Sequence, residues 1–136
     1  MRNFLFIISL FFAVSLTAQN KADDIVGYFY SIDPFTDEPS QNYIYRAADG
    51  TYEAKVVWVK NPNLKHHEGL VFMTKLTFNA KKNEWEDGVM LYPGKKGSYK
   101  AYMSIMPDGK LKVRGYWGIS MLGKTLYWTR EKELRK

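Results

Sequence analysis

The sequence predicts an all-β protein: a single eight-stranded antiparallel up-and-down barrel that follows a signal peptide. Three observations support this prediction. Short segments in which apolar and polar residues alternate recur along the chain, the period of half-buried strands. Clusters of Gly, Pro, Asn and Asp separate these segments as turns do, and nothing after the first 18 residues has helical periodicity. A two-sheet sandwich fits the same pattern, but successive hairpins favour the barrel.

The first residues have the character of a secretory signal peptide. Met1-Arg2-Asn3 precede an apolar run, residues 4–16, and small Ala18 stands before the expected cut. A membrane-spanning helix needs about 20 apolar residues, so we expect residues 1–18 to be removed and residues 19–136 to form one domain with its core at about 25–130. We expect a periplasmic or secreted protein with no transmembrane segment in the mature chain. Without cysteine, it has no disulfide and no lipoprotein anchor.

Turn signals in the sequence separate the expected strands. Asp49-Gly50 is a strong hairpin signal, Gly88 is a candidate bulge that shifts the phase of its strand, and the charged tail, residues 131–136, is expected to fray. The expected strands are 25–31, 42–46, 52–59, 70–78, 84–92, 99–105, 111–117 and 124–130.

The interior of an eight-stranded barrel is filled by side chains or holds one small ligand. Six large aromatic residues lie on the more apolar faces of their strands, so we expect them to converge there and to contact an apolar ligand. They are Tyr52, Trp58, Phe72, Trp85, Tyr99 and Trp117. Thr74 and Asp87 are the polar residues on the same faces, and they either orient a ligand's polar end or bond to each other or to water.

A closed barrel joins its last strand to its first. Leu126, Trp128 and Arg130 share one face of the last strand, and Phe29 lies on the first strand. We therefore expect Arg130 to lie across the ring of Phe29, a cation–π contact worth about 0.5–2 kcal/mol.

Metal-binding and catalytic patterns are weak. The acidic loop, residues 33–38, matches no EF-hand spacing, and His66 and His67 beside Glu68 lack a third ligand at zinc spacing, so we expect no metal and no cofactor. Glu84, Glu86 and Asp87 are the acids close enough to suggest a glycosidase-like pair, although acids on a solvent-facing strand are commoner. No nucleophile or phosphate-loop motif is present.

The net charge of the chain is +6, which favours anionic partners. The lysines are scattered over turns and outer faces without a long run. Tyr116 and Trp117 with Arg114 and Lys112 resemble a base-stacking platform, but the alternation turns Trp117 inward and an exported protein seldom meets nucleic acid. We therefore expect no nucleic acid and consider an anionic envelope component as a partner.

Several short motifs resemble the bacterial family filed as domain of unknown function 2147. They are Gly69-Leu70, Tyr92-Pro93 leading to Gly97 and Tyr99, the run Leu111-Lys112-Val113-Arg114-Gly115-Tyr116-Trp117-Gly118, Leu122-Gly123-Lys124-Thr125 and Trp128-Thr129-Arg130. The resemblance implies a small exported β-barrel and no established activity. Where that family commonly has Gly-x-Trp, this chain has Gly27-Tyr28-Phe29. A fainter likeness is to lipocalin-type barrels, in which Phe29 and Arg130 would take the parts of an early tryptophan and a late arginine.

Three functions are open at this point. The first is a non-enzymatic binding protein with a small apolar ligand in or at the mouth of the barrel, supported by an aromatic content of 16%. The second is a solid barrel that binds an envelope polymer or protein through its basic exterior. The third is an envelope hydrolase that uses Glu86 or Asp87. A cavity favours the first, an exposed aromatic and basic patch the second, and converging carboxylates in a cleft the third.

Overall fold

The computed structural model of the chain describes residues 20–92, 96–116 and 124–136. The expected signal peptide and Trp117 lie outside these residues. The described part contains eight strands and two short 3-10 helices. In chain order they are η1 (Ala22–Ile25), β1 (Gly27–Ile32), β2 (Pro39–Arg46), β3 (Tyr52–Val59), η2 (Pro62–His67), β4 (Val71–Asn79), β5 (Glu84–Leu91), β6 (Ser98–Ile105), β7 (Leu111–Tyr116) and β8 (Lys124–Glu131).

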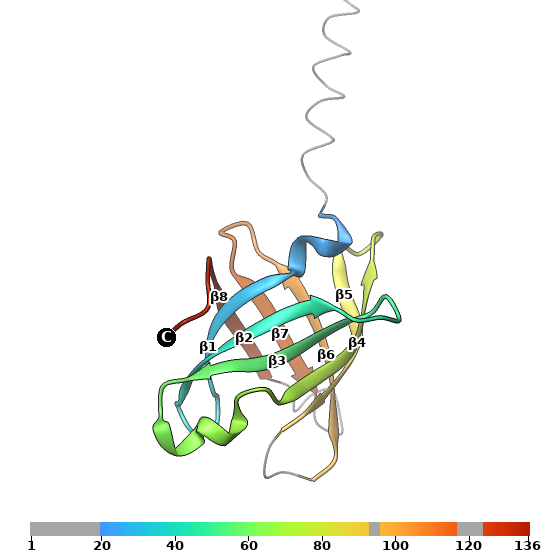
Figure 1. Cartoon of the computed structure of the whole chain (residues 1–136). Coiled ribbons are helices and arrows are strands. Elements are labelled where there is room, and N and C mark those ends of the chain that lie inside the picture. Colours follow the sequence, from blue (N-terminus) through green and yellow to red (C-terminus); the bar gives the residue numbers. More distant parts are fainter. Residues whose placement is uncertain (1–19, 93–95, 117–123) are drawn as a thin grey trace, which may run out of the picture.

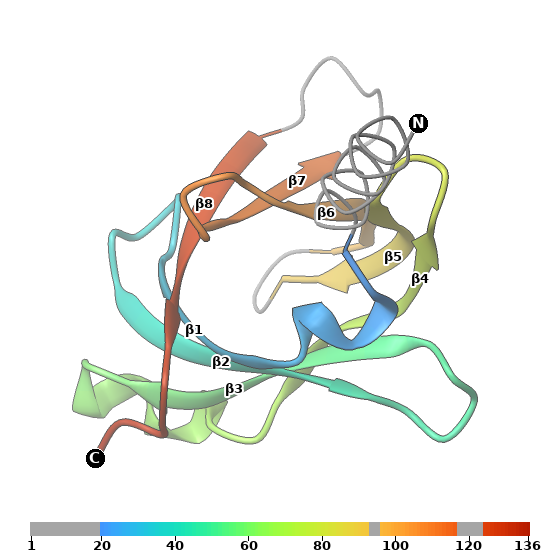
Figure 2. The same cartoon turned by 90° about the horizontal axis from the view of Figure 1, so that it is seen from above.

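The strands form one closed antiparallel barrel in up-and-down order (Figures 1 and 2). Each strand pairs with the next along the chain, and β1 closes the barrel by pairing with β8, with Phe29 opposite Arg130. The predicted fold is therefore confirmed, and the sandwich is not formed. Ile25, expected to begin the first strand, instead ends η1, a helix whose first turn is held by a hydrogen bond from the Lys21 amide to the Asp24 carboxylate at 2.8 Å.

A bulge in β3 reverses the predicted orientation of Trp58. Gln41 pairs with Trp58, but its neighbour Asn42 pairs with Val56, so Val57 is an extra residue on this strand. A bulge shifts the two-residue alternation by one position. Val59 is therefore buried in the barrel, while Trp58 lies on the outer surface. The prediction of an inward Trp58 was wrong.

The two polar residues predicted to lie in the interior, Asp87 and Thr74, are each turned outward by an irregular strand pairing. Asp87 has a left-handed backbone (φ 61°) at a register shift between Trp85 and Gly88, so Gly88 takes the buried position and Asp87 is exposed. The bulge expected at Gly88 is thus centred one residue earlier.

Thr74 is displaced by the adjoining strand pair. The register of β3 and β4 shifts beside Phe72, which brings fully buried Met73 opposite Ala54 and Met90 on the inner face. The next residue, Thr74, pairs with Val89 on the outer face. Both polar interior candidates were therefore placed on the wrong side of the sheet.

The end of the barrel next to η1 is filled by large side chains, and this helix lies over it (Figure 2). The Trp85 indole Nε1 donates to the Ala22 carbonyl oxygen at 2.9 Å, and the Tyr52 hydroxyl donates to the Asp23 carboxylate. Burial together with this hydrogen bond raises the pKa of Tyr52 to about 12. Ile25 adds a fully buried side chain from the helix itself. The same core contains Phe29, Ile44, Leu76, Met103 and Leu111.

The seam between β1 and β8 is covered by Arg130. Its guanidinium carbon lies 4.6 Å from the centroid of the Phe29 ring, the contact expected from the sequence. Nη1 donates to the Val26 carbonyl at 3.1 Å and Nη2 to the Asp24 carbonyl at 2.6 Å. Gly27, with φ of 150°, leaves room for this side chain, since a Cβ there would lie 2.8 Å from Nη1. One side chain thus joins β8, β1 and η1.

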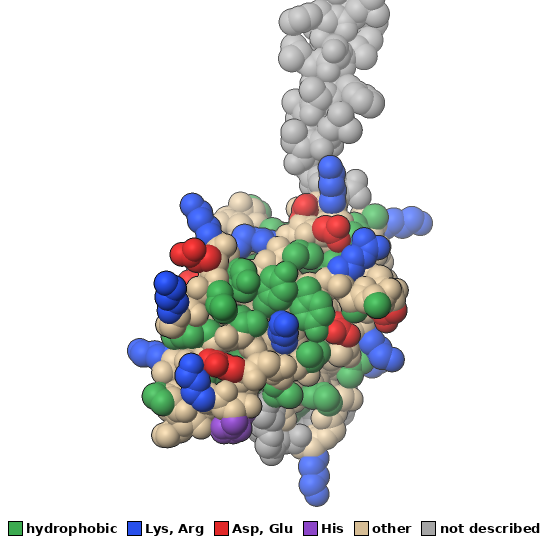
Figure 3. Space-filling model, viewed as in Figure 1, with side chains coloured by type: hydrophobic (Ala, Val, Ile, Leu, Met, Phe, Trp, Pro, Cys, Tyr) green, Lys and Arg blue, Asp and Glu red, His purple; other side chains and the backbone are tan. Residues whose placement is uncertain are grey.

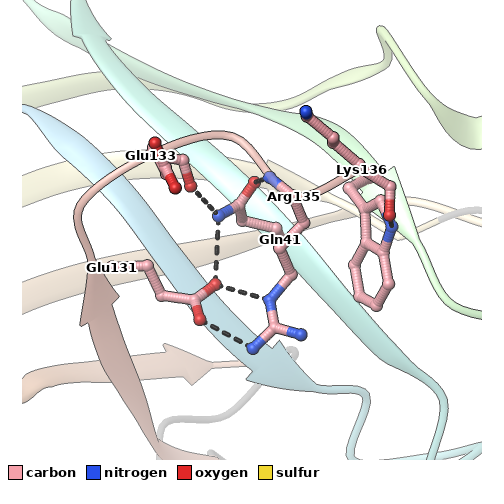
Figure 4. A network of polar contacts seen from close by, with 6 residues as sticks. Gln41, Glu131, Glu133, Arg135 and Lys136 are labelled. Carbon is pink, nitrogen blue, oxygen red and sulfur yellow. Dashed lines mark hydrogen bonds and ion pairs between the residues drawn. The ribbon is translucent and has the colours of Figure 1, made fainter.

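The C-terminal tail, residues 132–136, does not fray but packs on the outside of β1–β3 (Figure 4). The buried Gln41 side chain donates to the Glu131 carboxylate at 3.0 Å and to the Glu133 carbonyl at 2.9 Å, and it accepts from the Arg135 amide at 3.0 Å. The Arg135 guanidinium lies over Tyr30 and Trp58, 4.6 and 5.1 Å from their ring centroids. The expectation of a frayed tail was wrong because the outward Trp58 and Gln41 provide a surface for it.

We expect acid to release this tail. The hydrogen bonds from Arg135, and secondarily that from Gln41, hold the pKa of Glu131 below its ordinary value of 4.5. A carboxylate with a lowered pKa in the folded state stabilises at higher pH, and this contribution is lost as the pH falls from 4.5 through the lowered pKa. The emission of Trp58, taken as the difference between wild type and Trp58→Phe, should shift to longer wavelength over that range. Arg135→Ala should show the shifted emission at neutral pH; an unshifted Trp58 in that variant would contradict tail docking.

Candidate functional site

The other end of the barrel contains a cavity of about 560 Å³. Its wall comes from the end of β1, the start of β2 and the equivalent ends of the remaining strands, whereas η1 precedes the start of β1. The cavity therefore lies at the end of the barrel opposite η1, the lower end in Figure 1. Most of its lining is apolar and includes Val56, Val59, Leu64, Leu70, Phe72, Met90, Val113, Leu126 and Trp128.

The barrel is filled at one end and hollow at the other because its inward residues differ in size along the strands. Towards η1 the inner layer contains the large, fully buried side chains of Tyr52, Trp85 and Phe29. Towards the opposite end the same faces present shorter side chains, among them Ser31, Ser40, Val56, Val113 and Gly115. An eight-stranded barrel is just wide enough for large side chains to fill, so shorter ones leave space.

The loop between β1 and β2 lies over part of the mouth. Asp33 accepts a hydrogen bond from the hydroxyl of Tyr92, which follows β5, and burial together with this bond raises the pKa of Tyr92. Phe35 packs edge-on against Tyr92 with ring centroids 5.0 Å apart. The Lys124 ammonium at the start of β8 lies 4.5 Å from the Phe35 centroid. The predicted acidic loop is therefore tied across the barrel to β5 and β8.

The loop with the two histidines forms another part of the rim. Asn61 donates to the Glu38 carboxylate at 3.0 Å, which links this loop to the acidic loop, and Glu68 accepts from the Val59 amide at 3.1 Å. His67 and Leu64 of η2 line the cavity. Within residues 20–92, 96–116 and 124–136 no three His, Cys, Asp or Glu side chains lie close enough together to hold a metal ion.

The floor of the cavity carries a small polar group. Asn42, 3% exposed, donates from Nδ2 to the Ser31 hydroxyl at 2.9 Å, and the hydroxyls of Ser31 and Ser40 lie 3.2 Å apart. Trp128, 4% exposed, lies on the same floor, and its indole Nε1 has no hydrogen-bond acceptor among the described residues. Its ring packs between Phe29 and Phe72, at centroid distances of 6.4 and 6.1 Å.

The structure separates the six aromatic residues predicted to line a ligand site. Phe72 and Tyr99 line the cavity. Tyr52 and Trp85 point inward but belong to the filled core next to η1. Trp58 is on the outside, and Trp117 lies outside the described residues.

Sequence reasoning missed the polar floor. Trp128 was assigned only to barrel closure, and Ser31 and Asn42 were not singled out. A signal was present in the sequence. Ser31 stands two residues after Phe29, and Asn42 stands two residues before Ile44, so each polar residue shares an inward face with an apolar one. Polar residues at inward positions of an apolar strand face mark a place where hydrogen-bonding groups are buried.

The acids considered for catalysis do not line the cavity. Glu86 accepts from Nδ2 of the Asn79 side chain at 2.9 Å and lies 3.9 Å from the Lys82 ammonium, while Asp87 is exposed. The acidic residues that do line it, Asp33 and Glu38, are engaged by Tyr92 and Asn61 at the rim.

The outer face of β1–β3 carries a patch of three neighbouring tyrosines, and hydrophobic side chains gather on this face (Figure 3). The rings of Tyr28 and Tyr43 are 4.8 Å apart and those of Tyr43 and Tyr45 are 5.8 Å apart, with the Lys55 ammonium over Tyr45 at 5.4 Å. Basic and acidic side chains are interspersed around this patch in Figure 3 rather than gathered by sign. No helix in the described part of the chain is long and apolar enough to cross a membrane.

Comparison with known proteins identifies both the fold and the family. No curated protein sequence matches the chain. Among solved structures, the protein HP1028 from the human pathogen Helicobacter pylori, described as belonging to the lipocalin family, superposes with a TM-score of 0.66 at 17% sequence identity, over 81% of this chain and 84% of that one. At this identity the likeness shows the fold alone. The model of a family of uncharacterized proteins conserved in bacteria, DUF2147, matches residues 27–130, which run from the start of β1 to Arg130. The chain therefore belongs to the bacterial DUF2147 family and has a lipocalin-like barrel.

Proposed function

We propose that this protein binds one small, predominantly apolar ligand inside the barrel, without catalysing a reaction. The cavity carries the proposal. Its volume of about 560 Å³ falls within the range of about 300–1,000 Å³ that is usual for small-molecule sites. Its wall is mostly aliphatic and aromatic, so a bound alkyl chain gains about 0.8 kcal/mol for each buried CH₂ group.

The architecture supports a binding role in two further ways. The filled core and η1 close one end of the barrel, and the cavity at the other end is already part of the fold. The two rim loops are hydrogen-bonded to each other, and the acidic loop is hydrogen-bonded to Tyr92 after β5. These bonds hold the two loops in place at the mouth of the cavity. A largely preformed site loses less conformational entropy on binding.

We further propose that the protein acts after export, in the periplasm or outside the cell. This rests on the character of residues 1–18, a short apolar run behind Arg2 with small Ala18 before polar residues. Apolar compounds of the cell envelope, such as fatty acids and isoprenoids, are then the ligands to test.

The test uses N-phenyl-1-naphthylamine, a dye that fluoresces more strongly in apolar surroundings. We expect a saturable increase in emission with one site per chain, reversed by competing envelope lipids. Leu126 lines the cavity, so the larger ring in Leu126→Trp should occupy part of the space that the dye needs and weaken dye binding by about tenfold, since overpacking costs about 1–3 kcal/mol.

The matched control is Tyr127→Trp, which introduces the same side chain one residue further on. Tyr127 is 56% exposed on the outer face, so this variant should bind the dye as the wild type does. Circular dichroism and thermal unfolding establish that both variants fold. Absence of saturable dye binding to the wild type, or equal binding by Leu126→Trp, would contradict a ligand site in the barrel.

A further inference from the structure

The geometry points to a second binding site, on the outside of the barrel, where an acidic polysaccharide binds to a basic face of β6–β8. In the closed ring of eight strands β7 lies opposite β3, so this face is turned away from β2 and β3 (Figure 2). The site is separate from the cavity. The basic face consists of the outward side chains Lys100, Tyr102, Ser104, Lys112, Arg114, Tyr116, Thr125, Tyr127 and Thr129.

Within its outline the basic face carries positive charge alone. Residues 98–104, 111–116 and 125–129 contain three cations and no Asp or Glu. Acids follow at the margins, with Glu84 at the start of β5, Asp108 in the turn after β6 and Glu131 at the end of β8, where Glu131 is paired with Arg135. A surface of one charge sign attracts partners of the opposite sign. The basic face is therefore complementary to an anionic partner.

Arg114, at the centre of the face, is held in place by neutral groups. Its Nη1 donates to the Thr125 hydroxyl, and its Nε donates to the Tyr116 hydroxyl at 3.2 Å. The guanidinium carbon lies 5.1 Å from the centroid of the Tyr116 ring. Tyr102 supports this ring from β6, with ring centroids 5.7 Å apart and the two hydroxyls at 3.2 Å. These contacts orient the guanidinium without neutralising its charge.

The other arginines in the described part of the chain have their charge or their donors engaged within the fold. Arg46 pairs with Asp23 and Arg135 with Glu131, while Arg130 donates to two backbone carbonyls. A guanidinium presents a planar fork of N–H groups that fits the two oxygens of a carboxylate. When the side chain is oriented beforehand, binding loses less conformational entropy. Arg114 is thus suited to bind a carboxylate from outside the chain.

The remaining side chains of the basic face fit a sugar chain better than a lipid bilayer. None of them is aliphatic, so the face has nothing to insert among acyl chains. The hydroxyls of Ser104 and Thr129 can donate to and accept from sugar hydroxyls. The Tyr127 ring, 56% exposed, offers an apolar surface to the C–H groups of a sugar ring. Acidic polysaccharides occur in bacterial envelopes, so the choice of this partner rests on the proposed export.

Calorimetric titration with tetragalacturonate, a short chain of sugars that each carry a carboxylate, tests the proposal. We expect saturable binding, and binding at least about tenfold weaker for uncharged maltotetraose. Arg114→Ala should weaken the binding of tetragalacturonate by about tenfold, the size of one hydrogen bond to a charged group. Arg114→Lys should recover only part of this loss, because lysine keeps the charge but lacks the fork.

Arg46→Ala is the matched control. It removes the same charge from the end of β2, on the other side of the barrel, where Arg46 lies 3.8 Å from Asp23. The affinity for tetragalacturonate should then change by less than about twofold, because solvent and salt screen distant surface charges. Circular dichroism establishes that each variant folds.

A second measurement uses the wild-type protein and so does not depend on the folding of a variant. In a ¹H–¹⁵N spectrum the backbone amides of Arg114, Thr125 and Tyr127 should move when tetragalacturonate is added. Those of Val56 and Leu64, which line the cavity, should stay in place. Movement confined to the cavity residues would contradict a site on the basic face.

Three further results would overturn the inference. Absence of saturable tetragalacturonate binding removes the site. Equal losses in Arg114→Ala and Arg46→Ala would show a general attraction of charge rather than a site. Tighter binding of oligothymidylate, or of vesicles of phosphatidylcholine and phosphatidylglycerol, with the same dependence on Arg114 would assign the face to nucleic acid or to a bilayer. Because N-phenyl-1-naphthylamine reports on the cavity and tetragalacturonate on the outer face, failure of this inference and failure of the proposed function are distinguishable.

Discussion

Replacing Trp85 with alanine should lower the free energy of unfolding by about 3–5 kcal/mol, the usual cost of deleting a large buried ring. Trp85 is fully buried, packs against Phe78 at a centroid distance of 4.8 Å and donates to Ala22. The variant therefore leaves a void in the filled core and releases η1. Since domains of this size are stable by about 5–15 kcal/mol, the loss should be plain in urea-induced unfolding.

Trp58→Ala is the matched control, because the alternation of the sequence alone puts both tryptophans inside. The structure places Trp58 on the outer surface against Arg135, so we expect this substitution to cost about 1 kcal/mol. Comparable losses in the two variants would contradict the bulge in β3 and restore the orientation predicted from the sequence.

Arg130→Ala should lower the stability by about 2 kcal/mol and the melting temperature by several degrees. The guanidinium contributes a contact with the Phe29 ring, worth about 0.5–1 kcal/mol where exposed, and charge-assisted hydrogen bonds to the carbonyls of Asp24 and Val26. Its loss disconnects β8 from η1. Differential scanning calorimetry of the two proteins at neutral pH measures the effect.

Arg130→Lys provides the comparison for this variant. Lysine keeps the charge but lacks the planar fork that reaches two carbonyls at once, so it should recover less than half of the lost stability. Both variants should bind N-phenyl-1-naphthylamine as the wild type does, because the cavity opens at the opposite end of the barrel. An unchanged melting temperature in Arg130→Ala would show that the seam does not depend on this side chain.

The three functions that the sequence left open are not equally supported by the structure. The cavity gives no support to a barrel packed solid. The tyrosine patch on β1–β3 is accompanied by acids as well as bases, so it offers no surface of one charge sign on that face. For a hydrolase that uses Glu86 or Asp87, these carboxylates would have to face a common cleft, and neither lines the cavity. Of the three hypotheses, the geometry favours ligand binding.

Positions in regular strands were predictable, and positions next to bulges were not. Tyr99, Ala101 and Met103 all point inward in β6 as their alternation predicts, because β6 pairs with β7 without a register shift. Trp58, Thr74 and Asp87 were each misplaced beside a register shift. A single inserted residue reverses every orientation beyond it, and its position depends on the partner strand rather than on the strand's own sequence.

The sequence by itself determined the all-β class, the eight strands and their order, because alternation and turn chemistry are local properties that each segment carries alone. It also determined the contact between Phe29 and Arg130, since closure of an up-and-down barrel brings the first and last strands together. Only the tertiary structure decided that the barrel is filled near η1 and hollow at the other end, and that Trp128 with Ser31 forms the floor. Those features depend on which inward residues lie at the same height along the barrel axis. The stagger of the eight paired strands sets this height, and the sequence of a single strand does not encode the stagger.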